Sequence, residues 1–436
     1  MNTPAWNPAI EFMEREALER LQLASLRKTV AWALKTPFYR QRLAEVGLTR
    51  SEDIISLRDV RNMPYTTKED LREAYPEGLL AVDRELVVRL HTSSGTTGAP
   101  TVIYHTQGDI DSWTELVARC VVATGATRRD VFQNMTGYGL FTGGLGLHYG
   151  AEQVGMLVIP ASSGNSSRQV RLMQDFRTTV VHATPSYLLH LQAVLVDEDI
   201  DPTDLALQKA FIGAEPHSEE TRRRIESLFD IKAYNSYGLS EMNGPGVAFE
   251  CLHQTGLHLW EDAYILEIID PQTLQPLAEE EPGEVVLTTL QRQATPLLRY
   301  RTRDLSHLAG GYCPCGRVHR RLARLQGRSD DLLIINGVNV FPSQIESTLM
   351  KVPGVGTNYL IQIEKRGSLD RLLVKTEVDA SLFASHPRTL DKLRERISEL
   401  LRSAILVKPA VELHQPRSLP MSEGKARRVV DLRPAF

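Results

Sequence analysis

The chain has 436 residues, of which 42% are hydrophobic and 24% charged, and its formal net charge is -4. These values are ordinary for a soluble globular protein, and the length calls for at least two domains. The charge gives no reason to expect nucleic acid as a partner, and no apolar stretch reaches the roughly 20 residues needed to span a membrane. Residues 1–10 lack the pattern of a signal peptide and four cysteines are too few for a disulfide framework, so we expect a cytoplasmic enzyme.

The N-terminal part is predicted to contain an amphipathic helix over residues 11–34 and two strands, at residues 86–90 and 101–104. Between the strands lies the loop H-T-S-S-G-T-T-G-A-P, residues 91–100. Its glycines can turn backbone N–H groups inward and its hydroxyls add donors, so the loop could cradle phosphate oxygens. A flexible surface hairpin is the simpler interpretation of this composition. The loop lacks Gly-Lys-Ser/Thr and runs into a strand, which excludes a Walker loop.

The middle of the chain alternates short apolar runs with amphipathic stretches, which predicts a mostly parallel α/β sheet. Strands are expected at residues 156–160, 180–185 and 210–214, with a helix over 168–176 capped from Asn165 or Ser166. From residue 257 the pattern changes to strands without helices, at 264–269 and 283–288, which predicts an antiparallel or barrel-like part over about 257–326.

The last hundred residues predict a compact α+β domain. Ser343 and Glu346 have the spacing of a capping box, with Pro342 just before them. The expected strands are residues 332–335, 359–364, 371–378 and 411–414, and the expected helices are 343–350 and 389–401.

Four polar stretches could carry chemistry, and each has a simpler interpretation. The carboxylate of Glu241, in Y-G-L-S-E, could hold Mg²⁺ beside a phosphate or be a surface glutamate. Asp304, in R-Y-R-T-R-D, could accept hydrogen bonds from ribose hydroxyls or pair with a neighbouring arginine. The G-R-S-D-D stretch at 327–331 lies at the expected domain junction and could be a charged linker. Lys425, in S-E-G-K-A, could be catalytic or a solvated surface lysine.

In order and spacing, these stretches resemble the AMP-forming acyl-adenylating superfamily, which includes the acyl-CoA synthetases, and within it the phenylacetate–CoA ligase type. The resemblance covers essentially the whole chain. It implies a large α/β adenylating domain over residues 1–329 and a small mobile α+β domain over 330–436. One departure is visible: such ligases often carry lysine before the proline of the phosphate loop, and here the residue is Ala99. The motifs are S-S-G-T-T-G-A-P-T, G-Y-G-L-F-T-G-G-L-G, I-G-A-E-P, Y-G-L-S-E-M-N-G-P-G-V, R-Y-R-T-R-D, G-R-S-D-D, G-V-N-V-F-P-S-Q-I-E and E-G-K-A.

The activity implied by the resemblance is ATP-dependent activation of an aryl acid such as phenylacetate. An acyl-adenylate forms first and the coenzyme A thioester second, with Mg²⁺ required and with AMP and pyrophosphate released. One alternative is a relative that uses another aryl or small acid, or passes the adenylate to a carrier thiol or a cofactor hydroxyl. A non-catalytic nucleotide- and zinc-binding homologue is disfavoured because both Glu241 and Lys425 are present. A homodimer is a further hypothesis.

The resemblance also assigns roles to individual residues. Glu241 would bind Mg²⁺, Asp304 and Arg328 would hold the ribose, and Lys425 would contact the reacting carboxylate and α-phosphate. Asp330 would be the hinge of a rotation that replaces Lys425 with the segment around Gly337, whose missing side chain lets the pantetheine arm pass. The β- and γ-phosphates would be held by Ser93, Ser94, Gly95, Thr96, Thr97 and Gly98. The adenine would be enclosed by Gly213, Ala214, Glu215, Pro216, Asn235, Ser236 and Tyr237, with Gly238 and Ser240 beside them.

The acyl pocket is expected in the glycine-rich stretch 137–146, where Tyr138 and Phe141 could form aromatic walls, with Gly213 nearby. The equally weighted alternative is that both aromatic residues belong to the core. The stretch lacks a G-x-G-x-x-G that opens a helix, which excludes a dinucleotide loop.

A structural zinc site is the last hypothesis. Cys251, Cys313 and Cys315 supply three thiolates, and His258, preferred over His253, supplies an imidazole. Reduced, buried cysteines beside an unrelated histidine are the alternative, because C-x-C is a poorer signal than paired C-x-x-C.

Overall fold

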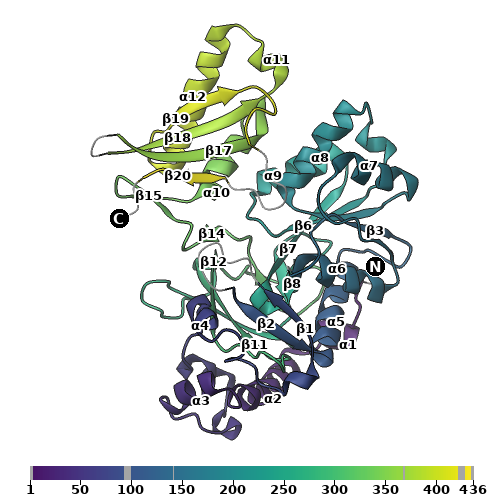
Figure 1. Ribbon diagram of the computed structural model, residues 1–436, viewed down its shortest axis with the longest axis vertical. Coiled ribbons are helices and arrows are strands. Elements are labelled where there is room, and N and C mark those ends of the chain that lie inside the picture. The colour runs from purple at the N-terminus through teal and green to yellow at the C-terminus, as the bar shows by residue number, and fades with distance from the viewer. Residues whose placement is uncertain (1–2, 93–99, 141, 367–368, 421–427, 434–436) are drawn as a thin grey trace. The chain divides into compact units, whose positions relative to one another are not determined.

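A computed structural model describes residues 3–92, 100–140, 142–366, 369–420 and 428–433 of the chain (Figure 1). The chain divides into two compact units. Unit 1 comprises Met1–Ser162, Thr178–His182 and Tyr234–Leu325, and unit 2 comprises Ser163–Arg177, Ala183–Ala233 and Gln326–Phe436. Within the described ranges, no helix has both the length and the apolar character that crossing a membrane requires.

Unit 1 begins with helices. The helix expected over residues 11–34 is present as Arg15–Ala33, but its predicted start is wrong, because a separate short helix ends at Glu11. The Glu11 carboxylate accepts hydrogen bonds from the backbone N–H groups of Trp6 and Asn7 and forms a fully buried ion pair with Arg317, which fixes the chain at this break. The helices here are α1 (Pro8–Glu11), α2 (Arg15–Ala33), α3 (Pro37–Ala44) and α4 (Lys68–Glu73), with 3-10 turns η1 (Ser51–Asp53), η2 (Leu57–Asn62) and η3 (Arg84–Leu86).

The two strands that flank the Gly/Ser/Thr loop form an antiparallel hairpin, as predicted. They are β1 (Val87–Thr92) and β2 (Val102–Thr106), and Thr92 faces Val102 in the register. The loop residues 93–99 lie outside the described residues.

The parallel part of the α/β fold is confirmed. Strand β3 (Val131–Asn134) pairs in parallel with β4 (Leu157–Ile159) and with β5 (Val180–Ala183). Helices α5 (Gln107–Ala123) and α6 (Thr142–Val154) pack tightly, since a Cβ on Gly150 would lie 2.3 Å from Val117 Cγ1.

The antiparallel part follows in the chain. β7 (Lys232–Leu239) pairs with β8 (Gly244–Glu250), β8 with β9 (Leu257–Leu259), and β9 with β13 (Arg321–Leu322). The 3-10 turn η5 (Ser240–Met242) joins β7 to β8. A separate antiparallel sheet contains β10 (Tyr264–Ile269), β11 (Gly283–Thr289) and β12 (Tyr300–Ser306). This agrees with the antiparallel character expected after residue 257, and closure into a barrel stays a prediction.

Unit 2 contains α7 (Ser166–Asp175), α8 (Pro185–Asp197), η4 (Pro202–Asp204), β6 (Lys209–Gly213) and α9 (Glu219–Phe229). Of the two capping residues considered for α7, Asn165 is the cap: its side-chain oxygen accepts a hydrogen bond of 3.1 Å from the Arg168 N–H.

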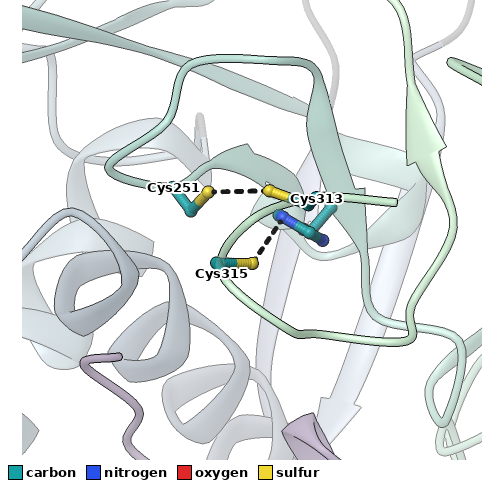
Figure 2. Close-up of side chains that lie close together, drawn as sticks. Cys251, Cys313 and Cys315 are labelled. Carbon is teal, nitrogen blue, oxygen red and sulfur yellow. Dashed lines mark hydrogen bonds between the residues drawn. The ribbon is translucent and has the colours of Figure 1, made fainter. Parts of the chain in front are cut away.

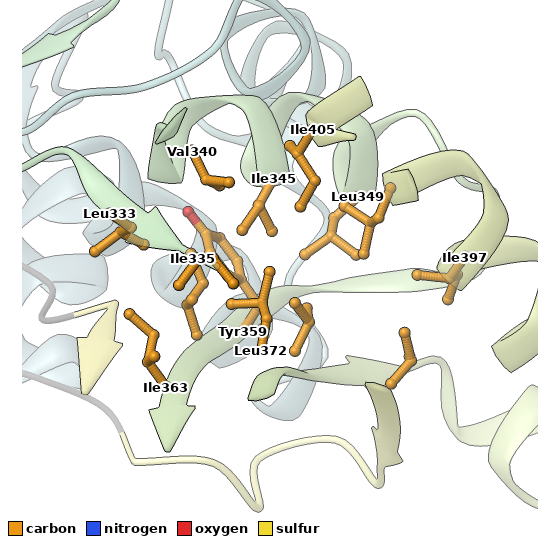
Figure 3. Packing of buried hydrophobic residues seen from close by; sticks show 14 of the residues in the cluster. Leu333, Ile335, Val340, Ile345, Leu349, Tyr359, Ile363, Leu372, Ile397 and Ile405 are labelled. Atoms are coloured by element: carbon orange, nitrogen blue, oxygen red, sulfur yellow. The ribbon is translucent and has the colours of Figure 1, made fainter. Parts of the chain in front are cut away.

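The C-terminal part of unit 2 is an α+β fold around one apolar core (Figure 3). β17 pairs with β18 antiparallel and with β20 in parallel, and β18 pairs in parallel with β19. Ile345 and Leu349 of α10 and Ile397 of α12 are fully buried in this core. The elements are β14 (Gly327–Arg328), β15 (Leu333–Ile335), β16 (Val338–Val340), α10 (Pro342–Met350), β17 (Val355–Arg366), β18 (Leu369–Val378), α11 (Ala380–Phe383), α12 (Pro387–Ile405), β19 (Ala410–His414) and β20 (Val429–Asp431).

The capping box expected from Ser343 and Glu346 is wrong. The Phe341 N–H at the start of α10 donates to the Gln344 side chain at 3.0 Å, and Ser343 donates to the Gln326 carbonyl. The Glu346 carboxylate instead accepts hydrogen bonds from the Ser218 N–H at 3.0 Å and the Thr221 hydroxyl at 2.5 Å. A partner more than a hundred residues away therefore replaces the local one.

Candidate active site

Glu241 lies in η5, directly after β7, and its residue is only 5% exposed. The Lys68 ammonium is 3.7 Å from its carboxylate oxygen Oε1. The buried Arg292 guanidinium donates to its main-chain oxygen. The preceding residue, Ser240, is buried and its hydroxyl lies 3.2 Å from the Thr142 hydroxyl. Glu241 is therefore a buried residue whose carboxylate faces Lys68 and whose main-chain oxygen accepts from Arg292, not the surface glutamate of the simpler interpretation.

The hairpin that carries the Gly/Ser/Thr loop is tied to the surroundings of Glu241. The Thr92 N–H, just before the loop, donates to the Leu140 carbonyl at 3.2 Å, two residues from Thr142. The Tyr104 N–H, after the loop, donates to the Thr295 hydroxyl at 3.1 Å, three residues from Arg292. Both strands of the hairpin thus connect to segments that contact residues 240–241. The predicted phosphate ligands Ser93, Ser94, Gly95, Thr96, Thr97 and Gly98 lie outside the described residues.

Tyr237 and Asp304 are brought together in unit 1. The Tyr237 hydroxyl donates to Asp304 Oδ2 at 2.8 Å, and both residues are buried, at 4% and 8% exposure. Asp304 lies on β12, and Arg301, three residues earlier on the same strand, forms its ion pair with Glu284. The strand that carries Tyr237 needs a glycine at 238, because a Cβ there would lie 1.8 Å from the Gly244 carbonyl oxygen.

The other predicted adenine residues of β7, Asn235 and Ser236, both face strand β8 or its last residue. The Asn235 N–H donates to the Glu250 carboxylate at 2.8 Å, and Ser236 faces Phe249 in the antiparallel register.

Unit 2 contains the remaining predicted adenine residues. Gly213 is buried at the end of β6, and Ala214, exposed, has a φ of +65°, which is rare for a residue other than glycine. Glu215 accepts hydrogen bonds from the Ser186 N–H at 2.6 Å and the Ser186 hydroxyl at 3.0 Å. Pro216 is exposed. The turn after β6 is thus fixed by the N-terminus of α8.

The predicted ribose and hinge residues of unit 2 are joined to each other. Arg328 Nε and Nη2 both lie 2.8 Å from the Asp330 carboxylate. Gly337 is exposed in the turn between β15 and β16, with a φ of +82° and no atom within 4 Å of the position of a Cβ. Lys425 lies outside the described residues.

Tyr138 is half-buried in unit 1 and has polar partners. Its hydroxyl accepts a hydrogen bond of 3.1 Å from the Asn134 amide and lies 3.2 Å from His148 Nδ1. Burial raises the pKa of Tyr138 to about 12, so the hydroxyl stays protonated. Phe141 lies outside the described residues, and both interpretations of this aromatic pair, pocket wall or core, stay open.

The predicted zinc ligands form one cluster in unit 1 (Figure 2). The ligand atoms of Cys251, His258, Cys313 and Cys315 all lie within 4.8 Å of one another, and all four residues are buried. Cys251 Sγ is 3.6 Å from Cys313 Sγ, and Cys315 Sγ is 3.4 Å from His258 Nε2. His258, and not the alternative His253, belongs to this cluster.

Two charged residues of this site, Lys68 and Arg292, were not found by sequence reasoning. In the structure, T-K-E-D at 67–70 starts α4 with a capping box between Thr67 and Asp70. No sequence signal places that helix beside a residue more than 170 positions away, so the contact with Glu241 was inaccessible from sequence.

Comparison with known proteins finds relatives along nearly the whole chain. Residues 38–291 match the family model described as AMP-binding enzyme, and residues 337–433 match the one described as AMP-binding enzyme C-terminal domain. The chain is 44% identical to a phenylacetate–coenzyme A ligase of Thermus thermophilus over 98% of this chain and 99% of that protein. It is also 44% identical to a phenylacetate–coenzyme A ligase of Escherichia coli, with 97% of each chain covered.

Solved structures give the same likeness. A 2-hydroxyisobutyryl-CoA ligase in the postadenylation state, in complex with 2-HIB-AMP, matches with a TM-score of 0.92 and 28% identity over 97% of this chain and 91% of that chain. The same ligase with 2-HIB-AMP and CoA in the thioesterification state matches with a TM-score of 0.72 and 29% identity over 98% and 92%.

Proposed function

This chain belongs to the AMP-binding enzyme family and is an AMP-forming acid–CoA ligase, and from that premise we propose that its acid is phenylacetate. The carboxylate oxygen of the acid attacks the α-phosphorus of ATP and pyrophosphate leaves. The thiolate of coenzyme A then attacks the acyl carbon of the adenylate, and AMP leaves. The observation that carries the choice of acid is the high identity, over nearly the full length, to several ligases named for phenylacetate.

We propose that the site residues of unit 1 position ATP and neutralise the negative charge of its phosphates. A carboxylate that attacks ATP brings anion to anion, so positioning and charge neutralisation must supply most of the catalysis. Glu241 holds Mg²⁺ when ATP is bound, and its burial beside Lys68 and Arg292 keeps it in one place. Asp304 holds the ribose, and the 2.8 Å hydrogen bond from Tyr237 fixes the orientation of its carboxylate. The hydroxyl loop Ser93–Gly98 holds the β- and γ-phosphates.

The residues of unit 2 are proposed to complete the nucleotide site and to change partners between the two steps. Glu215, held by Ser186, and its neighbours enclose the adenine, and Arg328 shares the ribose. Lys425 serves adenylation only. Asp330 is the hinge at the boundary between domains 1–329 and 330–436, and Gly337, open on the side where a side chain would project, lets the pantetheine arm pass.

The acyl pocket is proposed to use Tyr138, Phe141 and Gly213. The Tyr138 hydroxyl is occupied by Asn134 and His148, which leaves its ring as the surface offered to an aryl group. A homodimer stays a prediction.

The cysteine and histidine cluster is proposed to bind a structural zinc ion. Three sulfur atoms and one imidazole nitrogen are the donor set that Zn²⁺ takes in closed tetrahedral sites, and the separations between them suit metal–ligand bonds of about 2.0–2.3 Å. The four residues come from the end of β8, from β9 and from the turn 313–316, so an ion here would join three segments of unit 1. Their burial leaves no open position for a substrate.

The direct test of the function is pyrophosphate release from ATP and Mg²⁺ with phenylacetate, with 2-hydroxyisobutyrate and with other acids, each with and without coenzyme A. Phenylacetate is expected to give the highest kcat/KM and to yield a thioester only when coenzyme A is present. Faster turnover of another acid would refute phenylacetate as the substrate. Pyrophosphate release without any thioester would instead indicate a carrier thiol as the acceptor.

A further inference from the structure

The contact between Lys68 and Glu241 brings a lysine to the centre of the predicted Mg²⁺ and phosphate site. Lys68 Nζ is 3.7 Å from Glu241 Oε1, and the Lys68 side chain keeps 34% of its surface exposed while that of Glu241 keeps 6%. The ammonium therefore reaches from a partly solvated position toward a buried carboxylate. Such a group can bind a ligand that enters from solvent.

The backbone that carries Lys68 is fixed to strand β12, which carries Asp304. The Thr66 N–H donates to the Arg299 carbonyl at 3.1 Å, and the Thr66 carbonyl accepts from the Arg301 N–H at 2.9 Å. Thr66 is fully buried, and its hydroxyl donates to the Leu298 carbonyl at 2.7 Å. Lys68 follows two residues later, as the first residue of α4. The backbone just before Lys68 is thus fixed to the strand of Asp304 by main-chain hydrogen bonds.

Arg292, beside Glu241, has donor atoms that no described residue uses. Arg292, 2% exposed, donates to the main-chain oxygen of Glu241, and its Nε and Nη2 atoms have no hydrogen-bond partner in the described part of the chain. The nearby Asp109 carboxylate accepts from the backbone N–H groups of Thr106, Gln293 and Ala294. Burial lowers the pKa of Arg292, yet a guanidinium remains protonated in proteins. Because these N–H donors of a buried guanidinium have no acceptor among the described residues, they favour a ligand rich in acceptor oxygens, such as a phosphate.

The residue at position 99 suggests why a lysine near Glu241 would be needed. In the phosphate loop, where similar ligases often carry lysine before the proline, this chain has Ala99. Alanine cannot neutralise phosphate charge. A lysine from another segment that is held beside the Mg²⁺ carboxylate can do so.

We propose that Lys68 binds the β,γ-phosphate part of ATP at Glu241 and supplies the positive charge that position 99 lacks. This inference rests on the proposed function only in its identification of the anion as ATP. An exposed ion pair without a ligand role is the competing explanation, and such pairs contribute about 0–1 kcal/mol. The two explanations differ in which nucleotides should bind more weakly when Lys68 is removed.

The test compares ATP with AMP, which lacks the β- and γ-phosphates. Nucleotide binding is measured by calorimetry in the presence of Mg²⁺ for the wild type, Lys68→Ala, Lys68→Arg and the control Lys28→Ala, which removes an exposed lysine of α2. Lys68→Ala is expected to weaken ATP binding by about tenfold or more and to leave AMP binding within about twofold. Lys68→Arg is expected to restore ATP binding to within a few-fold, and Lys28→Ala to match the wild type.

Unchanged ATP binding in Lys68→Ala, or an equal loss for ATP and AMP, would overturn the proposal, since the first shows no contact and the second shows a structural role. The nucleotide measurement needs no acid, so its outcome is independent of whether phenylacetate is the substrate.

Discussion

The hydroxyl of Tyr237 on β7 donates a 2.8 Å hydrogen bond to Asp304 Oδ2 on β12, and the two residues are 67 positions apart in the chain. This bond joins a residue proposed for the adenine side of the nucleotide site to one proposed for the ribose side. Because the bond is buried, loss of either partner leaves a polar group without its partner.

Asp304→Ala is predicted to weaken ATP and AMP by the same factor, about 10- to 100-fold, because both nucleotides carry the ribose and because a hydrogen bond to a charged group contributes about 1.5–3 kcal/mol. Tyr237→Phe should weaken both by only a few-fold. Titration calorimetry with the two nucleotides measures the change, and Asp391→Ala, on the exposed side of α12, is the control. Unaltered AMP binding in Asp304→Ala would exclude Asp304 from the ribose site.

Lys425→Ala is predicted to separate the two half-reactions. Pyrophosphate release should fall by about 100-fold or more, since a cation aimed at charge that develops in the transition state is lost. Thioester formation from preformed adenylate should survive within about twofold. Lys392→Ala, an exposed lysine of α12, is the control in both assays. Equal losses in the two half-reactions would count against the rotation of the C-terminal domain.

The metal cluster predicts about one zinc ion per chain by elemental analysis. Cys315→Ser should remove the zinc and lower the melting temperature, because a ligand of the closed site is lost. Cys120→Ala is the matched control, since Cys120 is buried but belongs to the Trp260 hydrogen bond and not to the cluster. Less than about half an equivalent of zinc in the wild type, together with reactive thiols, would refute the site.

The burial of His182 predicts that the protein loses stability as the pH falls below neutral. It is buried on β5, its Nδ1 lies 3.0 Å from Asn134 Oδ1, and burial lowers its pKa to about 3. The folded protein therefore keeps His182 neutral below the unfolded pKa of about 6.5, where the unfolded chain takes up a proton. The contribution of His182 to the free energy of unfolding is complete above about pH 6.5 and is lost as the pH falls toward 3. By pH 5 the free energy of unfolding should have fallen by about 2 kcal/mol.

Urea unfolding of the wild type and of His182→Gln at pH 7 and pH 5 measures this contribution. The variant is expected to lose less stability between the two pH values, and His182→Asn should behave in the same way. Identical pH dependence in all three proteins would show that His182 does not stay neutral in the fold.

The predictions from sequence succeeded where the signal is local. The strands around the Gly/Ser/Thr loop follow from apolar runs with turn residues between them, and the Asn165 cap follows from a side chain that reaches a backbone group three residues away. The order of the motifs was enough to identify the family. The sequence also predicted that Cys251, His258, Cys313 and Cys315 lie together, as the structure shows, while a zinc ion bound by them stays a prediction.

The sequence reasoning failed where a distant partner displaced the local one. Glu11 was expected to begin the helix over residues 11–34, but it is the last residue of α1, and its carboxylate pairs with Arg317. Glu346 had the spacing of a capping residue, but it bonds to Ser218 and Thr221. The contact of Lys68 with Glu241 could not be predicted either, because only the folded chain brings the two charges together. The site residue roles stay predictions until the variants above are measured.

The contacts of Glu346 also bear on any motion of the C-terminal segment. The carboxylate accepts hydrogen bonds from Ser218 and Thr221, next to α9, and from the Tyr359 hydroxyl at 3.1 Å on its own segment. If residues 330–436 swing away from α9, the contacts to Ser218 and Thr221 must break and the carboxylate must regain its hydration shell. Such a departure would have to cross an activation barrier, and the strength of the Glu346 contacts would help to set its rate.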